Sequence, residues 1–94
     1  MTLKTYPFDV ADYLKTDEDI RDFLLEAANT GGTSDLIHAL NTAARAKGMA
    51  SIAKKIGVSR TSLYKSLSED GNPRLETINK TLLALGCRLV VAEA

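Results

Sequence analysis

The sequence predicts an all-α domain of five or six helices that ends in a short β-strand. Three observations support this fold class. Apolar residues recur every three or four positions in several segments, which is the spacing of one helix face. Glycines and other turn formers separate these segments, at Gly31-Gly32, Gly48, Gly57 and residues 68–73. A β-branched, apolar run, Arg88-Leu-Val-Val-Ala92, comes only near the chain end. A chain of 94 residues is long enough to enclose a single core.

The first long helix is predicted to begin after Thr16. Thr16 and Asp19 have the spacing of a capping box, in which each side chain bonds the backbone N–H of the other residue. One apolar stripe follows, made by Ile20, Phe23, Leu24, Ala27 and Ala28. Asn29-Thr-Gly-Gly32 should end this helix. Residues 6–14, which precede it, are expected to be extended and to lead into one helical turn.

The second long helix should begin with Thr33 or Ser34 as its N-cap and end near Gly48. Its stripe is Leu36, Ile37, Leu40, Ala43 and Ala44. The last helix should carry Pro73 in its first turn, with Asn72 as its N-cap, and end at Gly86. Its stripe is Leu75, Ile78, Leu82, Leu83 and Leu85.

Two short helices are expected between the long ones, over residues 49–56 and 60–67. Ala53 is small enough for a steep helix crossing, and Gly57, four residues later, can take the positive φ of a tight turn. Ser59 suits the N-cap of the second short helix. Four apolar side chains should hold the pair on the core: Ile52, Ile56, Val58 and Leu63. This is the pattern of a helix-turn-helix, which serves either to read DNA or only to pack.

Charge is divided unevenly along the chain. Residues 1–35 hold eight acidic and three basic residues, a net charge of −5, and residues 36–94 hold nine basic and four acidic residues, a net charge of +5. Such an asymmetry suggests two surfaces with different partners, although small domains also scatter charge unevenly without functional meaning.

The sequence lacks the residue patterns of several classes of protein. Cys87 is the single cysteine and His38 the single histidine, so neither a disulfide within the chain nor a closed zinc site is expected. No phosphate-binding glycine loop and no nucleophile–base pattern is present, so we expect no enzyme, no catalytic residue, no metal and no cofactor. No apolar run has the length of a membrane span, and the N-terminus lacks an apolar signal region. We therefore expect a cytoplasmic protein without a membrane partner.

The hinge resembles the helix-turn-helix of phage-repressor-like (Xre/Cro-type) DNA-binding domains. Ile52-Ala53, Ile56-Gly57-Val58-Ser59 and Leu63 carry this resemblance. That family usually has an apolar residue near the end of its second helix, where this chain has Ser66 followed by Leu67.

A second resemblance covers nearly the whole chain. Four segments, 8–14, 44–49, 62–73 and 84–89, are similar in order to the antidotes of bacterial addiction modules, of the HigA-like kind. The resemblance implies the antitoxin of a type II toxin–antitoxin module. Such a protein neutralises a RelE/HigB-like ribonuclease toxin by direct binding and represses its own operon as a dimer.

If the hinge reads DNA, side chains near the start of its second helix would face base edges in the major groove. These residues are Arg60, Thr61, Tyr64 and Lys65, although Tyr64 fits a half-buried core position equally well. Phosphate contacts, which give affinity without sequence information, are expected from Ser51, Lys54, Lys55, Ser59 and Ser62. Residues 33–94 would then form the DNA-binding core of one compact domain that also includes residues 1–32.

The acidic N-terminal part, residues 1–32, is predicted to face the toxin, because a ribonuclease presents a basic site to RNA. The predicted contact residues are Tyr6, Phe8, Asp9, Asp12, Tyr13, Asp19, Asp22 and Glu26. Alternatively, Phe8 and Tyr13 merely cover the edge of the core.

The expected partners are thus double-stranded operator DNA, a toxin and a second copy of the chain. A lone terminal strand needs a pairing partner, so Leu89, Val90 and Val91 are predicted to pair across a homodimer axis. Two other functions stay open, a stand-alone phage-type transcriptional repressor and a pure protein-interaction domain whose hinge is only packing.

Overall fold

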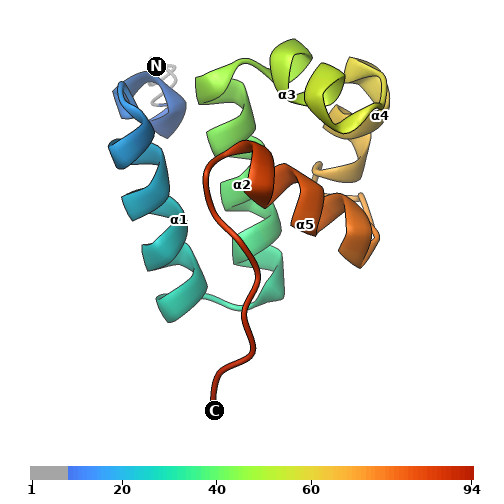
Figure 1. Ribbon diagram of the computed structural model, residues 1–94. Helices are drawn as coiled ribbons and strands as arrows, with labels where there is room; N and C mark the ends of the chain where they lie inside the picture. The colour runs from blue at the N-terminus through green and yellow to red at the C-terminus, as the bar shows by residue number, and fades with distance from the viewer. Residues whose placement is uncertain (1–8) are drawn as a thin grey trace, which may run out of the picture.

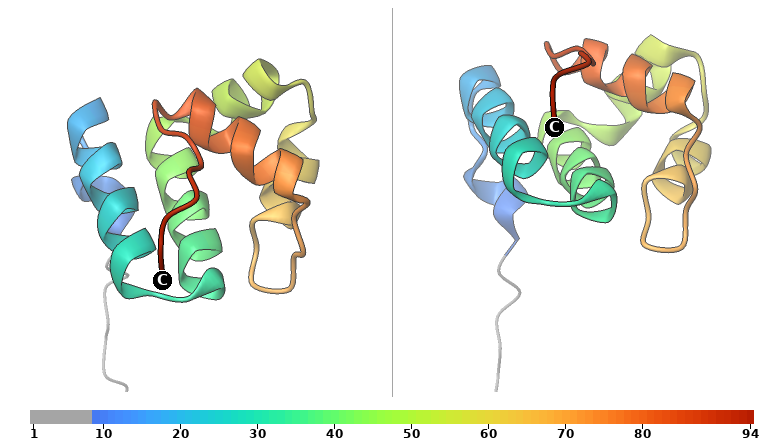
Figure 2. Two further views of the ribbon diagram at one scale, coloured as in Figure 1. Left: turned by 60° about the horizontal axis from the view of Figure 1, so that its bottom comes forward. Right: turned by 90° about the horizontal axis from the view of Figure 1, so that it is seen from below.

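The computed structural model describes residues 9–94, and over that range it contains five α-helices and one 3₁₀-helix (Figure 1). The all-α prediction is therefore confirmed. In chain order the elements are η1 (Val10–Tyr13), α1 (Asp17–Thr30), α2 (Thr33–Lys47), α3 (Met49–Ile56), α4 (Arg60–Ser66) and α5 (Leu75–Ala84). The central helix is α2, which contacts η1, α1, α3 and α5. α1 lies on one side of α2, and the pair α3–α4 lies on the other (Figures 1 and 2).

The predicted C-terminal strand is wrong for a single chain. Residues 87–94 have no regular secondary structure and run over α2 between α1 and α5 (Figures 1 and 2). A strand requires a neighbour that accepts and donates its backbone hydrogen bonds, and residues 9–94 provide none. β-Branched composition alone therefore does not make this segment a strand.

Among the three long helices, the start of α1 agrees with the sequence prediction and the starts of α2 and α5 differ from it. The capping box of α1 is confirmed: Thr16 Oγ1 accepts the Asp19 N–H at 3.0 Å, and Asp19 Oδ2 accepts the Thr16 N–H at 3.2 Å. The N-cap of α2 is Gly32 and not Thr33 or Ser34, because the Asp35 carboxylate accepts the Gly32 N–H at 3.1 Å.

The start of α5 lies two residues later than expected. Its N-cap is Arg74 and its first residue is Leu75, so Asn72 and Pro73 belong to the preceding loop. The cause is Gly71, which folds back against the end of α4 and donates its N–H to the Ser68 carbonyl at 2.9 Å. The chain then needs residues 72–74 to reach the start of α5.

The core lies around α2, and the apolar stripes predict it in part. Its buried apolar members are Ile20, Leu24, Ala39, Leu40, Ala43, Ala44, Met49, Ile52, Ala53, Leu63, Leu67, Leu82 and Leu85. Four predicted positions are wrong, because Ala28, Val58, Leu75 and Leu83 are exposed. The buried side of α5 is formed by Thr81, Leu82 and Leu85, and at about 100° per residue Leu83 lies on the other side of the helix. Leu75 is in the first turn of α5 and lies outside the core.

Two ion pairs fasten the acidic N-terminal elements to the basic end of α2. Arg45 Nη1 contacts Asp9 Oδ2, and Lys47 Nζ contacts Asp17 Oδ1. Asp9 also caps η1 by accepting the Ala11 N–H at 3.1 Å. The hydrogen bond from Arg45 holds the pKa of Asp9 below its usual value, and the hydrogen bond from Lys47 does the same for the pKa of Asp17.

These two lowered pKa values predict acid sensitivity of the fold. A carboxyl group with a lowered pKa stabilises the folded chain above its unfolded value, here 3.8, and this contribution disappears as the pH falls through the folded value. The free energy of unfolding, measured by urea denaturation at pH 7 and about pH 3, should fall less for the variant D9N/D17N than for the native chain. Equal acid losses in both proteins would contradict this assignment. Asp22→Asn, which removes a carboxylate without an ion pair among residues 9–94, is the control.

The contact of Gly71 with α4 predicts a second stability effect. An added Cβ would lie 2.3 Å from the carbonyl oxygens of Lys65 and Ser66, which are backbone atoms and cannot move aside freely. Gly71→Ala should lower the free energy of unfolding by about 1–3 kcal/mol, as overpacking typically does. Gly32→Ala is the matched control, because its Cβ would meet nothing within 4 Å. An equal loss in both variants would mean that the tight contact is not the cause.

Candidate nucleic-acid interface

The turn between α3 and α4 has the local geometry that the hinge residues predict. Gly57 adopts the left-handed conformation, with φ 81° and ψ 29°. The Val58 N–H donates to the Ala53 carbonyl at 3.0 Å, which closes the turn, and Ala53 itself is buried. The chain can therefore leave α3 and enter α4 within three residues.

α4 is held at both ends. At its start, Ser59 Oγ accepts the Ser62 N–H at 3.0 Å, which confirms the predicted cap. Along its inner side, Leu63 and Leu67 are each 1% exposed. Leu67 is the C-cap residue that follows the helix. It fills the core position for which the resemblance to phage-repressor-like domains predicts an apolar residue near Ser66. The Ser59 cap and the two buried leucines therefore hold this short helix on the core.

The four predicted base-reading residues share one exposed face of α4. Arg60, Thr61, Tyr64 and Lys65 are all exposed. Thr61 and Lys65 lie opposite the buried Leu63 and Leu67, whereas Arg60 is exposed in the first turn of the helix. Tyr64 is 45% exposed and is not among the side chains that pack against the core. Within residues 9–94, no side-chain hydrogen bond or ion pair occupies Arg60 or Lys65. Their charged donors are available to a ligand, and their role in DNA binding stays a prediction.

The predicted phosphate contacts divide into two groups. Ser51, Lys54, Lys55, Ser59 and Ser62 are all exposed. Lys55, however, borders two shallow clefts together with Leu83 and Ala84 of α5, so it faces α5 and not α4. Lys54, the preceding residue, points about 100° away from Lys55 around the helix. The structure therefore favours Lys54 over Lys55 as a neighbour of any ligand bound at α4.

The local charge suits an anionic ligand. Residues 49–67, which include α3 and α4, contain four bases, Lys54, Lys55, Arg60 and Lys65, and no acid. A one-sided charge of this kind attracts the phosphates of nucleic acid and accelerates their approach.

Only some of the predicted toxin-facing residues have exposed side chains. Tyr6 and Phe8 lie outside the described residues. Asp9 is paired with Arg45, and Asp19 Oδ2 accepts the N–H groups of Lys15 and Thr16. The remaining four, Asp12, Tyr13, Asp22 and Glu26, are exposed on η1 and α1. Leu25, which was not predicted, is also exposed on α1 between Asp22 and Glu26. Its place outside the apolar stripe of α1 is the signal in the sequence that distinguishes it.

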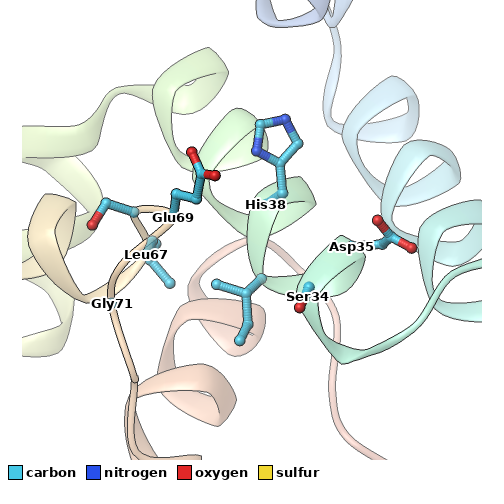
Figure 3. A pocket seen from close by; sticks show the side chains of 8 residues that line it. Ser34, Asp35, His38, Leu67, Glu69 and Gly71 are labelled. Carbon is cyan, nitrogen blue, oxygen red and sulfur yellow. The ribbon is translucent and has the colours of Figure 1, made fainter.

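One further groove, of about 470 Å³, lies between the start of α2 and the loop after α4 (Figure 3). Its lining includes Asp35, His38, Leu67 and Glu69, and the His38 side chain is exposed. No group of three His, Cys, Asp or Glu side chains among residues 9–94 is arranged to hold a metal ion. Cys87 is half-buried, and burial raises the pKa of its thiol, which opposes nucleophilic reactivity.

The part of the chain from residue 9 onward contains no helix that is long and apolar enough to cross a membrane. No solved structure is significantly similar to the chain. A Haemophilus influenzae (strain ATCC 51907 / DSM 11121 / KW20 / Rd) protein, described only as uncharacterized, is 37% identical over 94 residues, which are 100% of this chain and 97% of that protein. The model of the probable addiction module antidote protein family matches residues 4–93. This match spans nearly the whole chain, and the resemblance predicted from its four segments is thereby confirmed: the chain belongs to the probable addiction module antidote protein family.

Proposed function

We propose that the protein is the antitoxin of a type II toxin–antitoxin module, which binds its cognate toxin and represses its own operon through α4. Membership of an antidote family supports the toxin partner. For DNA binding, the observation that carries the proposal is the exposed face of α4. Arg60, Thr61, Tyr64 and Lys65 project from a helix that Ser59 and two buried leucines hold in place.

DNA recognition by this face follows from the donors it presents. Arg60, in the first turn of α4, can donate two parallel hydrogen bonds to O6 and N7 of a guanine. A cation in that turn is unfavourable for the helix dipole, so its position supports a role outside helix stability. Thr61 can meet a thymine methyl group, whereas Tyr64 and Lys65 lie one turn further along the groove. Lys54 supplies a phosphate contact from α3.

The operator-binding species is proposed to be a homodimer, because two copies of α4 would read two half-sites on one face of DNA. Leu89, Val90 and Val91 are exposed in the single chain and form no strand there. Pairing with the same segment of a second copy would satisfy their backbone hydrogen bonds and cover their side chains.

The proposed toxin is a RelE/HigB-like ribonuclease, whose basic RNA site would meet the acidic N-terminal part, residues 1–32. The first rival function is a stand-alone phage-type repressor, for which no toxin exists. The second is a pure protein-interaction domain. That function does not explain why Arg60 and Lys65 of α4 are exposed without a side-chain partner among residues 9–94.

DNA binding is tested by gel shift on the region upstream of the gene. Arg60→Ala should cost about 1–3 kcal/mol and relax specificity at one base position, because a bidentate contact is lost. Lys54→Ala should weaken binding to all sequences and reduce the salt slope by about one. Lys15→Ala removes the same charge ahead of α1 and should leave binding unchanged. If Arg60→Ala and Lys54→Ala both bind like the parent, α4 is not the reading helix.

The antidote role is tested by co-expression with the neighbouring gene. Induction of that gene alone should arrest growth, and induction together with this protein should restore it. A neighbouring product that is harmless in both arms would favour the stand-alone repressor.

A further inference from the structure

We propose that the cognate toxin docks on the outer face of α1, with Leu25 as the apolar anchor and Glu18, Asp22 and Glu26 around it. The inference rests on the toxin neutralisation proposed above and names its surface. The partner that fits is a basic protein face with an apolar depression at its centre.

The geometry of α1 defines this outer face. Ile20 and Leu24 are each 3% exposed and face α2, with Ala27 half-buried beside them. At about 100° per residue, positions 18, 22, 25 and 26 lie on the opposite side of the helix. That side is not covered by any element from residue 9 onward, because α1 is at the edge of the molecule (Figure 2).

The charges on this face are not compensated within the described chain. Asp17 pairs with Lys47, and Asp19 is engaged in the N-terminal cap, but among residues 9–94 the side-chain carboxylates of Glu18, Asp22 and Glu26 make no hydrogen bond or ion pair. These three carboxylates follow one another at i, i+4 spacing, which places like charges side by side and destabilises a helix. A cationic partner removes that repulsion, so the face gains most from a basic ligand.

Arg21, the one base of α1, does not neutralise this series. A Cβ on Gly86 would lie 3.6 Å from Arg21 Nη1, so the guanidinium is directed toward the C-terminal segment. It lies on the flank of α1 and leaves the outer face acidic.

Leu25 is distinguished from other exposed leucines by its surroundings. It is 58% exposed and Leu83 is 56% exposed, so exposure alone does not separate them. Leu83 lies beside Lys55 and Lys80, which would repel a basic protein, whereas Leu25 has Asp22 and Glu26 as neighbours. An apolar anchor within an acidic ring is the arrangement that a basic partner can desolvate and hold.

The position of α1 relative to α4 decides whether toxin and DNA can bind at the same time. α1 and α4 lie on opposite sides of α2, and the two helices do not pack extensively against each other (Figure 1). A toxin on the outer face of α1 therefore leaves the exposed face of α4 open. Toxin and operator should bind the same antitoxin molecule together.

The experiment compares Leu25→Ser with Leu75→Ser, which removes an equally apolar and 70% exposed side chain from α5. The binding partner is the purified product of the neighbouring toxin gene, and affinity is measured by isothermal titration calorimetry. Leu25→Ser should weaken binding at least tenfold, and Leu75→Ser should bind like the parent. Circular dichroism and gel shift verify that both variants keep their helices and their operator binding.

A charge variant, E18Q/D22N/E26Q, provides the second arm. It should slow association and reduce the dependence of affinity on salt, because the steering charges are gone. In a gel shift, the toxin should retard the parent antitoxin–operator complex further and should not release the DNA.

The outcomes separate the two proposals. If the parent does not bind the toxin, the proposed function fails and the docking surface fails with it. If the parent binds and both Leu25→Ser and E18Q/D22N/E26Q bind equally well, the docking surface alone is wrong. Release of operator DNA by the toxin would also overturn it, because a partner confined to the outer face of α1 leaves the exposed face of α4 open.

Discussion

The packing around α2 is the constraint on which the rest of the structure depends. Residues 39–44 of α2 are six consecutive buried residues, so this helix is enclosed on every side over nearly two turns. Three of them, Ala39, Ala43 and Ala44, are small, which lets neighbouring helices approach closely. The buried polar side chains stay satisfied: Thr42 Oγ1 donates to the His38 carbonyl at 3.2 Å, and Asn41 Oδ1 accepts from Arg45 Nε at 2.9 Å. Loss of this packing would separate both sides of the molecule at once.

Enclosure of α2 also determines how charge is distributed over the surface. The basic side chains at the end of α2, Arg45 and Lys47, draw Asp9 and Asp17 inward as partners. Among the acidic residues of residues 9–94 that have no ion pair, Glu18, Asp22 and Glu26 lie together on the outside of α1, and among the bases without one, Lys54, Lys55, Arg60 and Lys65 lie on α3 and α4. An antidote that must hold a protein and is proposed to hold DNA gains from this separation, because one ligand then need not displace the other.

Much of the candidate interface is predictable because its signals are local. The Ser59 cap, the left-handed Gly57 and the Thr16–Asp19 capping box each involve atoms within four residues of one another. The register at the end of α4 was less predictable, because it depends on whether Ser66 or Leu67 reaches the core. That choice is made by the packing of α4 on its neighbours, which places Leu67 inside from a C-cap position.

By itself, the sequence determined the helix order, the hinge and the division of charge, since these depend on short-range hydrogen bonds, backbone angles and composition. Only the tertiary structure decided which acids are free and which are paired, because Asp9 meets Arg45 across 36 positions of the chain. It also decided that Leu83 and Leu75 stay outside the core, and that residues 87–94 form no strand without a partner. These outcomes depend on contacts between segments far apart in the chain, and no local pattern contains them.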